Sequence, residues 1–357
     1  MTPHRPPLAP FQDQPPGDIP MRRTAPSTPP LPRRRALLRG LACLSLAPLS
    51  LPAARAADAP WPGGRPISLI VPSAAGGAAD FVARTFASHV PRTLPQANVV
   101  VDNRPGAAGI LGALAAKAAP PDGYTFLLTS NSTHAANVSL YRNLRYDPQK
   151  DFVQVGMFGR FSSVLLVRSD APYRSLEELV AAARARPGTL NYGYYSSSSQ
   201  VPAELLRVLA HLRYQGVSYK SVTQILTDLI GGQLDFVFID TLSAAPALQN
   251  DRLRPIAVTS PRPLPALPQV PAASSVVPGL ELQGWFGLAA PAGTPAAAVE
   301  GMGRALQQAM ADPAVQQAYA ARGFENAWRS GPDLQRFIQE DIRRWAQWVE
   351  MAGIERM

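Results

Sequence analysis

From Pro66 onward, short apolar runs alternate with longer segments whose apolar residues recur at helical spacing. The first run, 67–71 (ISLIV), is typical of a strand buried on both faces of a sheet. The sequence predicts strands at 67–71, 98–103, 122–130 (with a turn), 153–158, 164–167, 190–194, 236–239, 256–259 and 285–290. Helices are predicted between most of them. Alternation of this kind predicts an α/β protein whose sheets are mostly parallel.

The segment 330–354 is the clearest helix in the sequence. Ser330 is a typical N-cap residue, and Pro332 falls in the first turn, where proline is tolerated. Apolar residues follow one broad face, so we expect this helix to pack on a sheet. Trp345 and Trp348 lie near that face. Core packing is the interpretation that we favour for them, and a ligand cage is the alternative.

The net charge of +9 is concentrated near the N-terminus. Residues 1–56 hold eight arginines and two aspartates, so they account for +6 of it. The rest of the chain is nearly balanced and has no basic stretch with interleaved aromatic residues. We therefore do not expect nucleic acid to be a partner.

Residues 1–56 also have the features of an export signal. Arginines at 33–35 precede an apolar stretch, 36–53, and small residues follow at Ala54 and Ala56. We expect cleavage near Ala56 and a mature protein in the periplasm. The three adjacent arginines suit the twin-arginine route as well as the general secretory route. The Pro-rich residues 1–32 are expected to be disordered, unless translation begins at Met21.

The only cysteine, Cys43, lies inside the apolar stretch of this signal. Cleavage would leave a mature chain without cysteine. Neither a disulfide nor a catalytic thiol is then expected.

The loop Ser73-Ala74-Ala75-Gly76-Gly77 joins the first predicted strand to a helix that begins near Ala78. It lacks the Lys-Ser/Thr pair of a P-loop and the third glycine of a dinucleotide fingerprint. Free backbone N–H groups and the helix dipole favour an anion at such a place. The alternative is that the two glycines only permit a tight turn. Asp80, in the first helical turn, either stabilises the dipole or accepts a hydrogen bond from a ligand.

A second polar loop, YYSSSSQ (194–200), also leads into a helix. Its serines offer hydroxyl and backbone N–H groups to an anion, or they form a solvated turn with one serine as the N-cap. Two such loops in two halves of the chain suggest a ligand held between two lobes.

Hydrolytic and metal chemistry find little support in the sequence. After the export signal only His89, His134 and His211 remain, and none forms a metal-binding pair. There is no G-x-S-x-G elbow and no pair of catalytic carboxylates. We predict no catalytic residue, metal or cofactor. His89 is expected at the surface or its boundary, and His134 is the one histidine with a place near a possible cleft.

Several segments in order, among them RPISLIVP, VVVDNRPGAAG, PDGYTFLL, LRYDPQKDF, LTDLIGGQLDFVF and WFGLAAPAGTP, resemble one known family. It is the Bug family, the periplasmic solute-binding proteins of tripartite tricarboxylate transport systems. The resemblance extends from about 61 to 354. It implies a type II periplasmic-binding-protein (Venus flytrap) fold with two α/β lobes.

The resemblance also implies how the chain divides. After the signal, 1–56, residues 57–157 would form the first part of lobe 1, residues 158–284 lobe 2, and residues 285–357 the C-terminal part of lobe 1. Crossover strands are expected near 153–159 and 285–290.

By the same resemblance, two loops and their neighbours would grip a carboxylate. The implied ligand-binding residues are Ser73, Ala74, Ala75, Gly76, Gly77, Asp80, Ser130, Asn131, Ser132, Thr133, Ser197, Ser198, Ser199, Gln200, Tyr219 and Asp240.

Departures from the family pattern fall in these loops. Ser73-Ala74-Ala75 replaces Phe-Pro-Pro, Tyr194-Tyr195 replaces small residues, and Gln200 replaces histidine. The tyrosines either narrow the pocket, add a stacking surface for an aromatic acid, or face solvent or pack at an edge, which we favour. The ligand is therefore not identified by the sequence.

The function implied is non-enzymatic capture of a small organic acid. A monomeric binding protein would deliver it to a membrane permease made of two integral subunits. Alternatives are signalling to a membrane sensor kinase, an α/β enzyme acting on a carboxylate substrate, and a binding protein that has lost its ligand.

Overall fold

The computed structural model describes residues 61–249 and 251–357, which belong to one compact unit. The expected export signal at 1–56, with Cys43, lies outside these residues. Within the two described ranges, no helix has the length and apolar character needed to cross a membrane.

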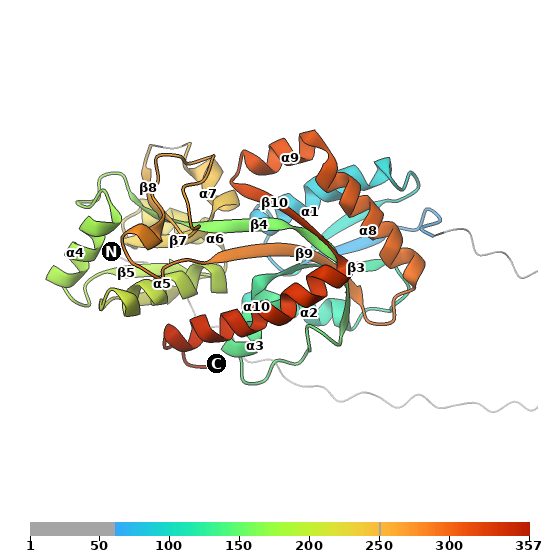
Figure 1. Cartoon of the computed structure of the whole chain (residues 1–357), viewed down its shortest axis with the longest axis horizontal. Coiled ribbons are helices and arrows are strands. Elements are labelled where there is room, and N and C mark those ends of the chain that lie inside the picture. Colours follow the sequence, from blue (N-terminus) through green and yellow to red (C-terminus); the bar gives the residue numbers. More distant parts are fainter. Residues whose placement is uncertain (1–60, 250) are drawn as a thin grey trace, which may run out of the picture. The chain divides into compact units, whose positions relative to one another are not determined.

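A ten-stranded sheet runs through this unit in the order β2-β1-β3-β9-β4-β7-β5-β6, with β8 and β10 also paired to β4 (Figure 1). The strands are β1 Ile67–Val71, β2 Val99–Asn103, β3 Thr125–Ser130, β4 Phe152–Arg168, β5 Asn191–Tyr194, β6 Gln215–Ser218, β7 Phe236–Asp240, β8 Leu253–Val258, β9 Gln283–Pro291 and β10 Phe324–Ser330. Strand β1 is parallel to β2 and β3, and β5 is parallel to β6 and β7. Every antiparallel pair involves β4 or β9, so the sheet is mixed at its centre.

Helices connect the strands and cover the sheet. They are α1 Ala78–His89, α2 Ile110–Lys117, α3 Asn137–Leu140, α4 Leu176–Ala185, α5 Ser197–Leu209, α6 Val222–Ile230, α7 Thr241–Ala247, α8 Ala296–Ala311, α9 Pro313–Ala320 and α10 Gly331–Met351. The predicted cap of the last helix is confirmed, because the Ser330 side chain accepts a hydrogen bond from the backbone N–H of Asp333.

The longest strand, β4, replaces the two separate strands predicted at 153–158 and 164–167. Its first part pairs with β9 and β10, and its second part pairs with β7 and β8. Together β4 and β9 occupy the two segments where crossover strands were expected. Gly159 lets β10 approach, because a Cβ atom there would lie 2.2 Å from the carbonyl oxygen of Glu325.

The two parts of the sheet have separate apolar cores. Phe86 of α1 packs edge-on against Phe158 of β4, with ring centroids 5.2 Å apart, in the core beside β1 and β3. Tyr192 of β5 packs with its neighbours in the core beside α5. Trp345 is fully buried in the second core, as predicted, and Trp348 packs perpendicular to it.

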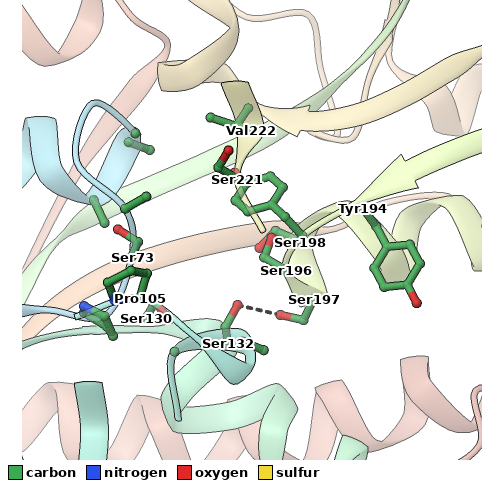
Figure 2. A pocket seen from close by; sticks show the side chains of 18 of the residues that line it. Ser73, Pro105, Ser130, Ser132, Tyr194, Ser196, Ser197, Ser198, Ser221 and Val222 are labelled. Carbon is green, nitrogen blue, oxygen red and sulfur yellow. Dashed lines mark hydrogen bonds between the residues drawn. The ribbon is translucent and has the colours of Figure 1, made fainter. Parts of the chain in front are cut away.

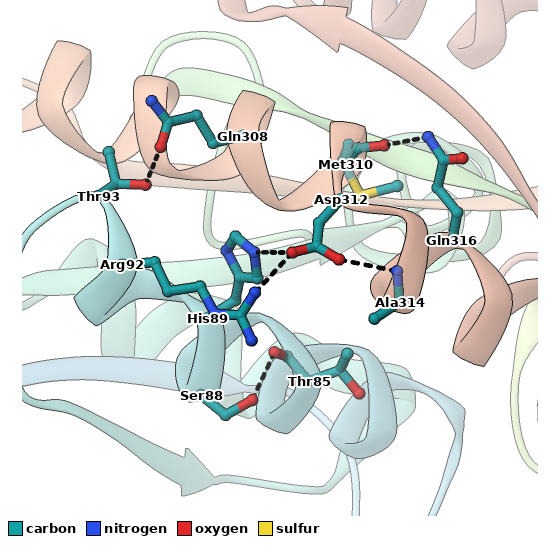
Figure 3. Close-up of polar contacts among 10 residues, drawn as sticks. All are labelled: Thr85, Ser88, His89, Arg92, Thr93, Gln308, Met310, Asp312, Ala314 and Gln316. Carbon is teal, nitrogen blue, oxygen red and sulfur yellow. Dashed lines mark hydrogen bonds and ion pairs between the residues drawn. The ribbon is translucent and has the colours of Figure 1, made fainter.

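The position of His89 was predicted wrongly, because this residue is buried rather than at the surface. Its Nε2 atom lies 3.0 Å from Oδ2 of Asp312 (Figure 3). The same carboxylate accepts hydrogen bonds from Arg92 and from the backbone N–H of Ala314, which it caps at the start of α9. The cluster ties the end of α1 to the junction of α8 and α9, so we assign it a structural role.

We predict that Gly159→Ala lowers the free energy of unfolding by about 1–3 kcal/mol, because the new methyl group overlaps the backbone of β10. Gly303→Ala in α8 is the control, since its Cβ atom would meet Val155 no closer than 3.7 Å. The control should raise stability by up to about 1 kcal/mol. Urea unfolding measures both, and equal stabilities of the two variants would contradict the packing described here.

Candidate functional site

A cleft of about 680 Å³ opens at the carboxyl ends of the parallel strands (Figure 2). Pro72 and Ser130 line it just after β1 and at the end of β3, and Tyr194 and Asp240 line it at the ends of β5 and β7. Strand ends from both parts of the sheet therefore face one space, which is where α/β proteins of this kind bind ligands.

Four helices of eight or more residues begin at this cleft, namely α1, α2, α5 and α6. Serines cap two of them: Ser196 forms a capping box on α5, and the Ser221 side chain caps α6. Helices α1 and α2 begin at Gly77 and Gly109 without a side-chain cap. The first N–H groups of a helix need an acceptor, and their partial positive charge favours an anion.

The segment Gly106–Gly109 at the start of α2 has an unusual backbone. All four residues have positive φ, at 130°, 47°, 50° and 87°. Two of them, Ala107 and Ala108, are alanines, which rarely adopt this conformation. Strained backbone of this kind clusters at ligand-binding sites. The segment lines the cleft but was not among the predicted site residues, although small residues after Pro105 repeat the pattern of the loop 73–77.

Buried hydrogen bonds join the two predicted loops at the cleft. The side-chain amide of Asn131 donates to Oγ of Ser198 at 2.9 Å and to Oγ of Ser197 at 3.3 Å. The hydroxyls of Ser132 and Ser197 lie 2.7 Å apart (Figure 2). Asn131 also accepts a hydrogen bond from the backbone N–H of Trp285 in β9. The loop after β3 is thus fixed to the start of α5 and to a crossover strand.

Asp80 does not line the cleft, although it was predicted to bind ligand. Its carboxylate accepts hydrogen bonds from the backbone N–H of Gly76 at 3.0 Å and from Nε of Arg84 at 2.9 Å. Burial alone would raise the pKa of Asp80, but the hydrogen bonds from Arg84 and Gly76 outweigh it and lower the pKa below its usual value. The residue holds the loop 73–77 in shape from behind.

Asp240 lines the cleft with its carboxylate already engaged. It accepts a hydrogen bond from the hydroxyl of Tyr195 at 2.6 Å and another from the backbone N–H of Ser243, which it caps. Burial raises the pKa of Asp240. Tyr195 and Tyr194 both line the cleft, so the preferred prediction that they face solvent or an edge does not describe them. Tyr194 also packs against Tyr192.

Most of the predicted site residues come together. Those that line the cleft are Ser73, Ala74, Ala75, Gly77, Ser130, Asn131, Ser132, Tyr194, Tyr195, Ser197, Ser198, Gln200, Tyr219 and Asp240. Those that do not are Gly76, Asp80, Thr133 and Ser199. The last two support the loops from behind: Thr133 bonds to Ser130, and Ser199 completes the capping box.

The sequence analysis missed many lining residues. They are Pro72, Ala78, Ala79, Leu128, Leu140, Tyr141, Ser196, Met357, the segments 105–109, 218 and 220–224, and Phe161 and Phe286 of the crossover strands. Among the described residues that line the cleft, Lys220 has the only basic side chain. His134 is fully buried behind the loop, where its Nδ1 lies 3.0 Å from the hydroxyl of Thr133. Burial lowers the pKa of His134 to about 3, so it is neutral at physiological pH.

We predict that Asp80→Asn destabilises the protein at pH 7 and that the difference decreases as the pH falls below ~4. The folded pKa of Asp80 is lowered, so its ionised form stabilises the fold above pH ~4. This contribution is lost as pH falls through the folded pKa. Urea unfolding at pH 7 and near pH 3 measures the effect. Asp170→Asn is the control, because its ion pair with Arg168 is exposed. A loss for Asp80→Asn that is equal at both pH values would refute the role given to this carboxylate.

Comparisons with known proteins agree with this geometry. Residues 82–354 match the family model described as the tripartite tricarboxylate transporter family receptor. A solved structure of R. palustris Rpa4515 with adipate is 31% identical, with a TM-score of 0.80, covering 83% of this chain and 100% of that one.

Two further solved structures are similar over nearly their whole length. The periplasmic binding protein BugD is 29% identical, with a TM-score of 0.77, covering 82% of this chain and 99% of its own. MatC from Rhodopseudomonas palustris, solved with bound malate, is 29% identical, with a TM-score of 0.74, covering 80% and 99%. These comparisons confirm the type II periplasmic-binding-protein fold, and the protein belongs to the tripartite tricarboxylate transporter receptor family of periplasmic solute-binding proteins.

Proposed function

We propose that this protein captures a small dicarboxylic acid in its cleft and delivers it to a membrane permease of the tripartite tricarboxylate type. The observation that carries the proposal is the convergence of α1 and α2, both without side-chain caps, on one cleft. A ligand carboxylate is the acceptor that the start of α1 lacks, whereas in α2 the N–H groups of Ile110 and Leu111 already donate to the carbonyls of Ala107 and Gly106.

The energetics favour this assignment. A hydrogen bond to a charged group contributes about 1.5–3 kcal/mol, and a helix N-terminus adds about 0.3–1 kcal/mol for an anion. The backbone N–H of Ala78, the first residue of α1, has no acceptor among the described residues. Small side chains at 73–77 and 106–109 let a carboxylate approach these groups closely.

The second carboxylate of the ligand would lie toward the other side of the cleft. Lys220 and the starts of α5 and α6 provide the positive groups there. Asp240 accepts hydrogen bonds from Tyr195 and Ser243, and these donors partly offset the repulsion between its carboxylate and an anionic ligand. Two proteins with similar structures, Rpa4515 and MatC, were solved with adipate and malate, and both ligands are dicarboxylates. The volume of about 680 Å³ is ample for either.

We further propose that residues 57–157 and 285–357 form one lobe and residues 158–284 the other. These limits fall inside β4 and near the start of β9, the strands shared by both parts of the sheet. Bending of two strands would let the lobes close on the ligand, exclude water and strengthen its hydrogen bonds. Export to the periplasm through the signal at 1–56 and action as a monomer belong to the same proposal.

Binding accounts for the cleft better than catalysis does. Asp240 and Tyr195 are hydrogen-bonded to each other, and His134 lies behind the loop rather than in the cleft. No described lining residue is a histidine or a cysteine that would serve as base or nucleophile. Signalling to a sensor kinase would use the same ligand-bound state and would differ only in the partner.

We predict that Ala78→Pro abolishes ligand-dependent stabilisation without unfolding the protein. Proline is tolerated at the first position of a helix, and Gly77 before it already has an extended backbone. The variant therefore removes one N–H donor and puts the ring carbons of proline in its place at the cleft. Adipate or malate at 100 times its dissociation constant should add about 2.7 kcal/mol of stability to the unaltered full chain, seen as a rise in Tm. The variant should show a much smaller rise at the same concentration.

Ala296→Pro is the matched control, because it places proline at the first position of α8, away from the cleft. The control should respond to the dicarboxylate as the unaltered chain does. An undiminished rise in Tm for Ala78→Pro would exclude the start of α1 as the group that binds the ligand carboxylate. A rise with neutral sugars but with no carboxylate would contradict the proposed ligand class.

A further inference from the structure

A second crevice, of about 360 Å³, lies on the opposite face of the crossover strands from the cleft. Phe161 of β4 and Phe286 of β9 line the cleft, and the preceding residues, Arg160 and Trp285, line the crevice. Adjacent residues of a strand point to opposite faces, so the two cavities share these strands as a common wall. Arg160 and Trp285 are directly paired across β4 and β9.

Helix α10 forms the other wall of the crevice. It lies along β4 and β9 (Figure 1) and contributes Phe337, Asp341, Arg344 and Trp348. The remaining lining residues are 281–284, at the start of β9. The crevice is therefore walled by aromatic rings and charged groups.

Arg160 is the group in this crevice that lacks a partner. It is partly buried, and its guanidinium lies 5.3 Å from the ring centroid of Phe337. Among the described residues its side chain has no hydrogen bond and no carboxylate within ion-pair distance. A partly buried guanidinium has lost water and normally gains hydrogen bonds in exchange.

The nearest acidic candidate on α10 is already committed. Asp341 accepts a hydrogen bond from Nε1 of Trp285 at 2.8 Å on one oxygen and from Arg344 at 3.2 Å on the other. It is almost fully buried, so it cannot turn toward Arg160 without losing both bonds. Glu281, at the exposed rim, forms no ion pair among the described residues.

A second arginine increases the positive charge at this place. Arg329 of β10 also lies over Phe337, at 5.1 Å, and its buried Nε has no hydrogen-bond partner. Burial and the positive charges of Arg329 and Arg344 lower the pKa of Arg160, outweighing the opposite effect of Asp341 and of Glu325, which pairs with Arg160 across β10 and β4. Arg344 is paired with Asp341, whereas the guanidinium groups of Arg160 and Arg329 form no ion pair among the described residues.

We propose that this crevice is a second anion-binding site, in which Arg160 binds the carboxylate or phosphate group of a small molecule. Guanidinium groups pair with both oxyanions through two parallel hydrogen bonds. The aromatic rings of Trp348 and Phe337 would cover the apolar part of such a molecule. The volume falls within the range of small-ligand pockets, about 300–1,000 Å³. The site stands apart from the cleft and from the ligand proposed for it.

Fluorine NMR of the full chain labelled with 5-fluorotryptophan tests the proposal. Two of the five tryptophans, Trp285 and Trp348, line the crevice, and none lines the cleft. Inorganic phosphate and acetate are titrated separately, with chloride at matched ionic strength as the reference. Trp348→Phe assigns one of the two resonances. We expect a saturable shift of the Trp285 and Trp348 signals with phosphate, acetate or both, and the arm that responds identifies the oxyanion.

Arg160→Gln should weaken this binding about tenfold or more, the effect of losing a charged hydrogen bond. Arg343→Gln is the matched control, because it removes the same charge next to Arg344 without lining the crevice, and it should bind within about twofold of the unaltered chain. Arg344→Gln, which removes the other lining arginine, provides the same test if Arg160→Gln does not fold. Ala78→Pro should leave the response intact.

Three results would overturn the site. They are no saturable shift with either oxyanion, an equal shift with chloride, or unchanged binding in Arg160→Gln (in Arg344→Gln if Arg160→Gln does not fold).

Discussion

The starts of α1 and α2 are the constraint on which the account of this protein depends. Both helices begin at one cleft without a side-chain cap. The first N–H groups of α2 donate to Gly106 and Ala107, whereas that of Ala78 in α1 has no acceptor among the described residues. Unpaired donors at a helix start are costly unless water or a ligand accepts from them. The small residues at 73–77 and 106–109 leave room for the acceptor, because a larger side chain would block its approach. Asp80 and its hydrogen bond to Gly76 keep the first of these loops in place.

The crossover strands β4 and β9 link these helix starts to the opposite side of the cleft. They connect the parts of the sheet that carry α1 and α2 on one side and α5 and α6 on the other. Asn131 joins the loop after β3 to α5 and to β9 through three hydrogen bonds. The same strands present Phe161 to the cleft and Arg160 to the crevice behind it. Any bending of β4 and β9 would therefore change the shape of both cavities.

Sequence patterns predicted the elements well where one physical signal dominated. The run 67–71 coincides with β1, and Ser330 caps α10 as its residue type suggests. The strand β4 was split in two, because Arg160, Ser162 and Ser163 interrupt its apolar pattern. These polar residues are accommodated by neighbouring elements: Ser163 donates to the carbonyl of Ser198, and Arg160 lies over Phe337. Neither contact can be read from the local sequence.

The site was predicted less completely, for the same reason. His89 and Asp80 have partners that only the fold brings close or orients, namely Asp312 in the first case and Arg84 with Gly76 in the second. The positive φ angles at Ala107 and Ala108 have no sequence signal, since alanine normally avoids them.

The central claim is that a ligand carboxylate occupies the uncapped start of α1. Amide NMR of the ¹⁵N-labelled full chain with and without adipate tests it most directly. We expect the amide proton of Ala78 to move downfield on binding, as a new hydrogen bond to a charged acceptor requires. Shifts confined to residues outside 73–79 and 106–110, with Ala78 unmoved at saturation, would contradict it.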